Sequence, residues 1–487
     1  MSLQVKLAGH NVDVEALHAR LAGKPEEEAG ALSPETLSAA YARISRDPRD
    51  VPELRRDARN EVEQARKSNR AIIFKMGHVS VAEHAVFNLD VLDLSRLATE
   101  ALEHHRLASY TEKSQRYIRL EQGFTTPPEL AGSALSAELA ALCRGLFETY
   151  QELAVRLTEH GRASQPQTAA EKQSQLEARA NEDARYALPL CTRTQLGMTV
   201  NARTLELMIR RAASHPLQEV QALGQALFEA VRDAAPSVIR YIDPTPYFRD
   251  SEAALAVRAQ ALFETVRDAV PAPGPVAVRL VQHTPDPDRW VAAALLFSAS
   301  AQPLEVCRQA AFAASAESLQ GLFREVFCRM EPWDVLPRAF EQVELTFELT
   351  LSAAAHAQLK RHRMATLLAQ PYEPSLGRTI PEAIQQAGLS DVFQRGLDRS
   401  EQLFGRIAAV RPEVAPYALT NAHHRRVLFR INARALGHFA RLRCDAEAQW
   451  DIRRIAQTMV ERAQEVMPQA AAFLGGKDCF ERLKQDL

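Results

Sequence analysis

Two short stretches alternate apolar and polar residues, and they lie in opposite halves of the chain. Phe87–Val91 and Leu345–Leu349 each place an apolar side chain at every second position, the period of a strand with one buried face. Residues 276–282 form a third strand-like run. The pattern therefore predicts a sheet in each half.

Helical patterns dominate elsewhere, for example over residues 136–160 and 217–241. A further amphipathic helix is predicted over residues 251–269, and the proline-rich residues 271–275 end it. Its apolar positions are interspersed with charged ones and are Leu255, Val257, Leu262, Val266 and Val270. The predicted fold class is α+β, with mixed sheets and long helices.

Composition narrows the class of protein. The chain has 487 residues and is 46% hydrophobic, which is enough to fill two cores. No apolar run reaches the roughly 18 residues of a membrane span, and the first residues lack the apolar core of a signal peptide. The six cysteines form no CxxC pair, and the net charge is −2. We therefore expect reduced thiols, a cytoplasmic location, and neither a nucleic acid nor a membrane as partner.

The chain contains an internal repeat. Asn201–Arg203 recurs as Asn432–Arg434, and His104–Arg106 in the first half corresponds to Arg361–Arg363 in the second. Such self-similarity predicts two related units in tandem. The predicted boundaries are a first unit at residues 1–248, a helical and proline-rich linker at 249–275, and a second unit at 276–487.

The densest polar motif covers residues 104–117. Seven residues separate Arg106 from Ser114, which is followed by Arg116 and Tyr117. Upstream, residues 77–84 read Gly-His-Val-Ser-Val-Ala-Glu-His. These motifs resemble the Arg-His-Arg, Ser-x-Arg-Tyr and Gly-His-x-Ser/Thr-x-x-Glu-His signatures of the flavin-dependent thymidylate synthases.

The resemblance implies a nucleotide-binding loop in the first half. In the family, a Glu-x-Ser-x-Arg loop holds deoxyuridylate (dUMP), and here it corresponds to Glu112, Ser114, Gln115 and Arg116. The family's phosphate-binding Arg before a Leu-Pro pair corresponds to Arg185. Arginine suits this task because its planar fork matches an oxyanion.

The second half carries the residues that complete the pyrimidine site in the family. These are Gln358 and Arg361 as substrate contacts, and Arg443 as the catalytic residue that favours the ionised base. The residues that correspond to the family's flavin contacts are Ser80, His105, Arg106, Arg361, His362, Arg363, Asn432, Arg434 and His438.

The resemblance also implies the reaction and its cofactors. The expected cofactor is FAD, with NADPH as reductant and methylenetetrahydrofolate as methylene donor to dUMP. No metal is expected, because the six-residue spacing of His78 and His84 suits no standard zinc motif. The family forms homotetramers, so two tandem chains are expected to form a homodimer that imitates one.

The family's features are divided unequally between the halves. The first half has the loop, but Ala101 replaces the pyrimidine-site Gln. Arg211 follows Asn201 by only ten residues, so it is expected about 80° away from the helix face that Arg443 uses. In the second half, prolines at 371 and 374 replace the loop, and Pro416 replaces Arg185. We therefore predict one composite site per chain, with the loop from the first half and Gln358, Arg361 and Arg443 from the second.

Two rival functions remain open at this stage. One is a flavoenzyme that acts on a different pyrimidine or nucleotide, because Ala101 and His104 depart from the family pattern. The other is a non-catalytic nucleotide- or flavin-binding descendant. Each arginine also has a plain structural interpretation as a solvated helix charge.

Overall fold

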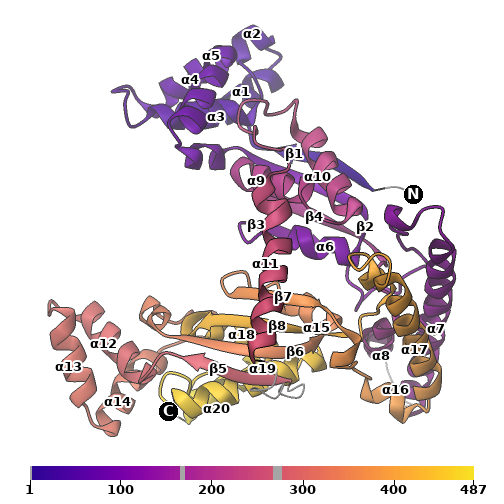
Figure 1. The fold of residues 1–487 in the computed structure, drawn as a ribbon. Helices are drawn as coiled ribbons and strands as arrows, with labels where there is room; N and C mark the ends of the chain where they lie inside the picture. The colour runs from indigo at the N-terminus through magenta and orange to yellow at the C-terminus, as the bar shows by residue number, and fades with distance from the viewer. Residues whose placement is uncertain (1–2, 165–169, 267–276, 487) are drawn as a thin grey trace.

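The computed structural model describes residues 3–164, 170–266 and 277–486. Within them, eight strands form two four-stranded sheets, one in each half of the chain (Figure 1). The first sheet contains β1 (Gln4–His10), β2 (Val86–Ser95), β3 (Ala108–Glu112) and β4 (Arg193–Asn201). The second contains β5 (Val278–His283), β6 (Glu344–Ser352), β7 (Thr366–Tyr372) and β8 (His424–Asn432).

The two sheets have the same topology. Their strand orders are β1-β2-β4-β3 and β5-β6-β8-β7, and every pairing is antiparallel. The expectation of mixed sheets was therefore wrong, because periodicity predicts that a strand exists and not which neighbour it pairs with. The period is confirmed in the first half, where Phe87, Leu89 and Val91 are buried and Asn88 and Asp90 are exposed. In the second half the polar position Thr346 is buried as well.

A helix follows each inner strand, and the same residue type begins it in both halves. Ser95 and Ser352 accept a hydrogen bond from the third residue beyond, both at 3.0 Å. Asn201 and Asn432 do the same at 2.9 and 2.8 Å. These are N-cap bonds, which satisfy donors that a helix start leaves open. The helices are α6 (Arg96–Glu103), α15 (Ala353–Leu359), α9 (Ala202–Ala213) and α18 (Ala433–Arg443).

Longer helices surround the sheets. The helix predicted over 136–160 is confirmed as α7, whereas the one predicted over 217–241 ends at Val231. The larger ones are α7 (Ala134–Ser164), α8 (Ala170–Ala184), α10 (Gln218–Val231), α17 (Ser390–Ala408) and α19 (Trp450–Val466). The others are α1 (Val14–Leu21), α2 (Glu26–Ala29), α3 (Pro34–Arg43), α4 (Val51–Asn60), α5 (Val62–Asn69), α12 (Pro287–Ala299), α13 (Leu304–Ala313), α14 (Ala316–Phe327), α16 (Glu382–Gln386) and α20 (Phe480–Gln485). No helix of the described residues is long and apolar enough to cross a membrane.

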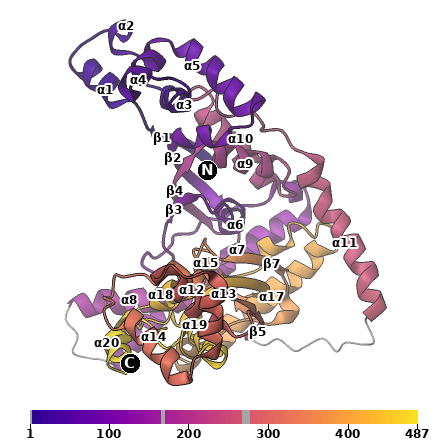
Figure 2. The ribbon, with the colours of Figure 1, turned by 90° about the vertical axis from the view of Figure 1, so that its left-hand side faces the viewer.

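The predicted linker helix is present as α11 (Pro246–Val266) and runs along the outside of the molecule (Figure 2). It has no buried residue, and Leu255 and Leu262 are 68% and 67% exposed. The proline-rich stretch 271–275 and Val270 lie outside the described residues.

The two halves share hydrophobic cores. Leu403 and Ile407 of α17 belong to a buried cluster otherwise made largely by the first half, and Phe393 packs in a cluster with Phe147 of α7. The backbones also join: Leu190 donates to Leu419 at 2.7 Å, and Asn421 to Leu188 at 3.0 Å. Because this contact is buried, residues from both halves can be held in one fixed site.

Candidate functional site

A pocket of about 890 Å³ lies between the two halves. From the first half it is lined by Arg106–Ser109 and by Thr199–Asn201 at the end of β4. From the second half, the lining comes from the segment after α15, from α18 and from the residues before β6. The polar lining residues there are Arg338, Glu341, Arg361, His362, Arg363, Asn432, Arg434, His438 and Arg443.

Arg106, from the first of the two repeated segments, meets the Arg361–Arg363 segment in this pocket. Arg363 donates from Nη1 to the carbonyl oxygen of Arg106 at 3.1 Å, and Arg106 donates to the carbonyl oxygen of Ala365 at 3.5 Å. Among the described residues, no carboxylate pairs with Arg106 or Arg363, and none pairs with Arg361 or Arg443. Four guanidinium groups that no carboxylate of the described residues pairs with make the pocket suited to an anionic ligand.

Arg443 lies at the end of α18 and contacts two other predicted site residues. Its Nε donates to Nε2 of His362 at 3.0 Å, and its Nη1 donates to Oε1 of Gln358 at 3.4 Å. Burial, with Arg361 nearby, lowers the pKa of Arg443 to about 10. Burial, together with Arg443 and His438, lowers the pKa of His362 to about 3. His362 is therefore neutral at pH 7 and accepts the hydrogen bond, while the arginine stays charged.

The start of α18 is fixed by two of the predicted flavin contacts. Asn432 caps the helix through its side-chain oxygen. Arg434 donates to the carbonyl oxygen of Leu336 at 2.7 Å and to Glu341 at 3.1 Å. His438 lies one turn further on, with its ring 6.1 Å from that of His362. All three line the pocket.

The predicted nucleotide loop follows β3 and touches the second half. The Ser114 hydroxyl accepts hydrogen bonds from the backbone N–H groups of Arg116 and Tyr117 at 3.1 and 3.4 Å. Arg116 pairs with Glu182 and donates to the carbonyl oxygen of Glu447 at 3.0 Å. The loop is thus a tight turn held against the segment that follows α18.

Arg185 lies beside this loop. Asn421 of the second half donates from Nδ2 to Oε1 of Gln115 at 3.0 Å and to the carbonyl oxygen of Arg185 at 2.9 Å. Arg185 is 9% exposed, and its Nε and Nη2 atoms have no hydrogen-bond partner among the described residues. The Nε2 atom of Gln115 is buried and unpartnered as well. Buried donors normally find an acceptor, so this cluster fits an anionic group of a ligand.

A chain of hydrogen bonds links the loop to the pocket. Gln358 donates to Oε1 of Gln449 at 3.2 Å, and Gln449 donates to the hydroxyl of Tyr186 at 3.0 Å. Tyr186 follows Arg185 directly and donates to Asp451 at 2.9 Å. Gln358 therefore contacts Arg443 on the pocket side and Gln449 on the other side, and Gln449 reaches Tyr186 next to Arg185.

Three predicted residues lie elsewhere. The Glu112 carboxylate is buried in an ion pair with Arg96, so it holds the loop onto α6. Ser80 is exposed in a 3-10 helix (Val79–His84) and does not line the pocket. His105 is buried and does not line the pocket either. Burial, together with Arg211 and His104, lowers its pKa to about 3.

Arg211 lies nearer to His104 and His105 than its ten-residue spacing from Asn201 predicted, and so resembles Arg443 in the second half more than expected. It is close enough to His104 and His105 to lower the pKa of both, as Arg443 does for His362. Its guanidinium lies over the ring of Phe248, 5.2 Å from the centroid, rather than on a histidine nitrogen.

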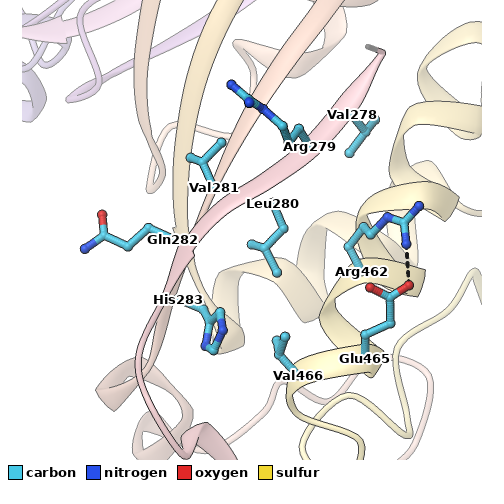
Figure 3. Close-up of a pocket in the computed structure, with 9 residues that line it drawn as sticks. All are labelled: Val278, Arg279, Leu280, Val281, Gln282, His283, Arg462, Glu465 and Val466. Atoms are coloured by element: carbon cyan, nitrogen blue, oxygen red, sulfur yellow. Dashed lines mark hydrogen bonds and ion pairs between the residues drawn. The ribbon is translucent and has the colours of Figure 1, made fainter. Parts of the chain in front are cut away.

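A second hollow, of about 540 Å³, lies between the edge strand β5 and α19 (Figure 3). Leu280, Arg462 and Val466 are among its lining residues, and none of the predicted site residues is. Among the described residues no cluster of three or more His, Cys, Asp or Glu side chains is placed to hold a metal ion.

Comparison with known proteins adds to the motifs. The profile of the family described as Thymidylate synthase complementing protein matches residues 30–237 and 279–469, one match in each half. The chain belongs to this family.

Relatives cover either one half or both. A flavin-dependent thymidylate synthase of Clostridium tetani is 30% identical over 219 residues, which are 44% of this chain and 84% of that protein. A UPF0159 protein of Chlamydia muridarum is 27% identical over 448 residues, 87% of this chain and 84% of that one. The solved flavin-dependent thymidylate synthase of Helicobacter pylori, complexed with FAD and dUMP, covers 49% of this chain and 99% of its own at 19% identity, with a TM-score of 0.33.

Two residues at this candidate site were not predicted from the sequence. Asn421 bridges the loop and Arg185 from the second half. Arg338 lines the pocket three residues before Glu341, as Ser80 precedes Glu83 by three. Both glutamates pair with the Arg of an Asn-x-Arg motif, Glu83 with Arg203 and Glu341 with Arg434. That repeated spacing could have identified Arg338 from the sequence, whereas no sequence pattern pointed to Asn421.

Proposed function

We propose that the protein is an FAD-dependent enzyme that methylates dUMP, with methylenetetrahydrofolate as carbon donor and NADPH as reductant. The observation that carries this proposal is the pair of buried, unpartnered nitrogens Nε and Nη2 of Arg185, a residue that Asn421 links to Gln115 of the predicted loop. A nucleotide phosphate placed there would accept from Arg185 and Gln115, which together offer donors that no described protein group uses.

The pocket between the halves fits FAD. Four of its guanidinium groups have no carboxylate partner in the described part of the chain, and they suit the pyrophosphate of a dinucleotide. They belong to Arg106, Arg361, Arg363 and Arg443. Arg434 and His438 would add polar contacts from α18. When bound, the reduced flavin supplies the two electrons that convert a transferred methylene into a methyl group.

Arg443 is the proposed catalytic residue. As C5 of uracil becomes nucleophilic, negative charge develops on the pyrimidine ring, and a fixed cation stabilises it. Arg443 is held by His362 and Gln358, so little reorganisation is needed during the reaction. Gln358 would orient the base by donating or accepting through its amide.

The arrangement favours one composite site per chain. The phosphate end comes from Ser114, Gln115, Arg116 and Arg185 of a unit at residues 1–248, and the pyrimidine end from a unit at residues 276–487, with 249–275 as linker. We further propose that two chains form a homodimer that imitates the family's homotetramer.

The test is turnover by the purified full chain, loaded with FAD and supplied with dUMP, methylenetetrahydrofolate and NADPH. Formation of deoxythymidylate and tetrahydrofolate in equal amounts is the expected result. Bound flavin that NADPH reduces without product from dUMP would refute this substrate and favour another pyrimidine nucleotide. Protein that takes up no flavin would refute the enzymatic function.

A further inference from the structure

The second half replaces the nucleotide loop by a longer strand. In the first half, β3 ends at Glu112, which pairs with Leu196, five residues before Asn201. In the second half, Ala369 is the residue that pairs with the position five before Asn432. Strand β7 continues for three more residues, to Tyr372. Counted along the chain, Tyr372 corresponds to Gln115 and Pro371 to Ser114, although an irregularity after Ala369 makes Tyr372 pair with Arg425.

Tyr372 is buried between the two halves. Its hydroxyl donates to Oε1 of Glu100 on α6 at 2.6 Å, and Arg425 donates to the other oxygen of Glu100 at 2.6 Å. The Arg425 guanidinium also lies over the Tyr372 ring, 4.3 Å from its centroid. Glu100 immediately precedes Ala101, the residue that replaces the pyrimidine-site Gln.

The two loop positions therefore differ in whether their buried hydrogen-bond donors have protein partners. At the first, Arg185 and Gln115 have buried donors without a described partner. At the second, Tyr372, Glu100 and Arg425 satisfy one another, and Pro416 stands where Arg185 would be. Although burial raises it, Arg425 and His356 hold the pKa of Glu100 well below its usual range, so the carboxylate stays charged and paired. Tyr372 occupies this position and the Arg425 guanidinium is engaged by Glu100, so neither side chain offers a free donor to a phosphate.

We propose that the chain binds a single nucleotide, because Tyr372 fills the second nucleotide position and fastens β7 to α6 of the other half. This inference rests on the proposed function of the first position. It assigns to Tyr372, Glu100 and Arg425 a structural role in place of a ligand-binding one.

Equilibrium dialysis of the flavin-loaded full chain against radiolabelled dUMP tests the count. One nucleotide per chain in the wild type, and none in Ser114→Ala, is the expected result. Two nucleotides per chain would overturn the inference while leaving the proposed function standing. No binding by the wild type would instead refute the proposed function, and the inference with it.

The role of Tyr372 is tested without any ligand. Tyr372→Phe removes only the hydroxyl and should lower the temperature of unfolding of the full chain. Tyr247→Phe, at a position that is 71% exposed on α11, is the matched control and should leave that temperature unchanged. Equal unfolding temperatures for both variants would show that Tyr372 does not fasten the halves. Dialysis of Tyr372→Phe should still give one nucleotide per chain.

Discussion

Arg443 donates a hydrogen bond from Nε to Nε2 of His362 over 3.0 Å, across the space between α18 and the end of α15. Since the pKa of His362 is lowered to about 3, the imidazole acts as an acceptor and fixes the guanidinium without neutralising it. A charged group held in this way, with no carboxylate partner among the described residues, is available to an anionic ligand.

Arg443→Ala should weaken dUMP binding roughly 10- to 100-fold, the cost of losing a hydrogen bond to a charged group. Arg211→Ala is the matched control, because Arg211 occupies the related helix of the first half and lies on Phe248. Isothermal titration of both variants with dUMP measures the difference. Equal losses would contradict a single composite site.

Arg185→Met should discriminate between a nucleotide and its nucleoside. Because the buried guanidinium is assigned to the phosphate, the dissociation constant of dUMP should rise roughly 10- to 100-fold. That of deoxyuridine should change by less than about threefold, since a nucleoside has no phosphate to lose. Similar changes for both ligands would place Arg185 elsewhere.

The ion pair of Lys360 with Glu103 joins the two halves at 2.7 Å, with both side chains 7% exposed. Lys360→Met leaves the Glu103 carboxylate buried and unpaired, which should cost about 3–5 kcal/mol of unfolding free energy. Arg329→Met is the control: its pair with Glu325 has the same length but is 74% and 67% exposed, so it should cost about 1 kcal/mol or less.

Urea unfolding of both variants measures these costs. The double variant Lys360→Met with Glu103→Leu should recover part of the loss, because it removes the unpaired charge. If Lys360→Met is as stable as Arg329→Met, the pair does not fasten the halves.

Stability should fall as the pH is lowered from about 6.5. The pKa values of His105 and His362 are near 3 in the folded protein, below the usual value of about 6.5. Below pH 6.5 the unfolded chain therefore binds protons that the folded one does not, and each histidine costs up to about 1.4 kcal/mol per pH unit until about pH 3.

His105→Gln should reduce this dependence, because it removes one of the histidines whose pKa burial lowers; His215, with a pKa of about 4, is another. The measurement is urea unfolding at pH 7.5 and 5.5, in the absence of flavin. A variant with the wild type's full loss of stability between these values would contradict the assignment.

Local patterns predicted much of this structure. The period-two strands are local signals, and they lie where the pattern placed them. The direction of strand pairing was not predictable, because it depends on which distant segment packs alongside.

The contacts between the halves could not be predicted from the sequence either. Asn421, which holds Gln115 and Arg185, belongs to the opposite half and to no motif. Arg211 was placed by counting residues along an ideal helix; its charge lowers the pKa of His105, but its guanidinium lies over Phe248. Motif spacing therefore yields candidate residues, and tertiary packing determines which of them meet.

The visible absorption spectrum of the FAD-loaded full chain, titrated with dUMP, tests the central claim most directly. The account predicts a shift of the flavin bands in the wild type that is lost in Ser114→Ala, from the first half, and in Arg443→Ala, from the second. A flavin spectrum that dUMP leaves unchanged in the wild type, or a shift that persists in either variant, would contradict a site shared between the halves.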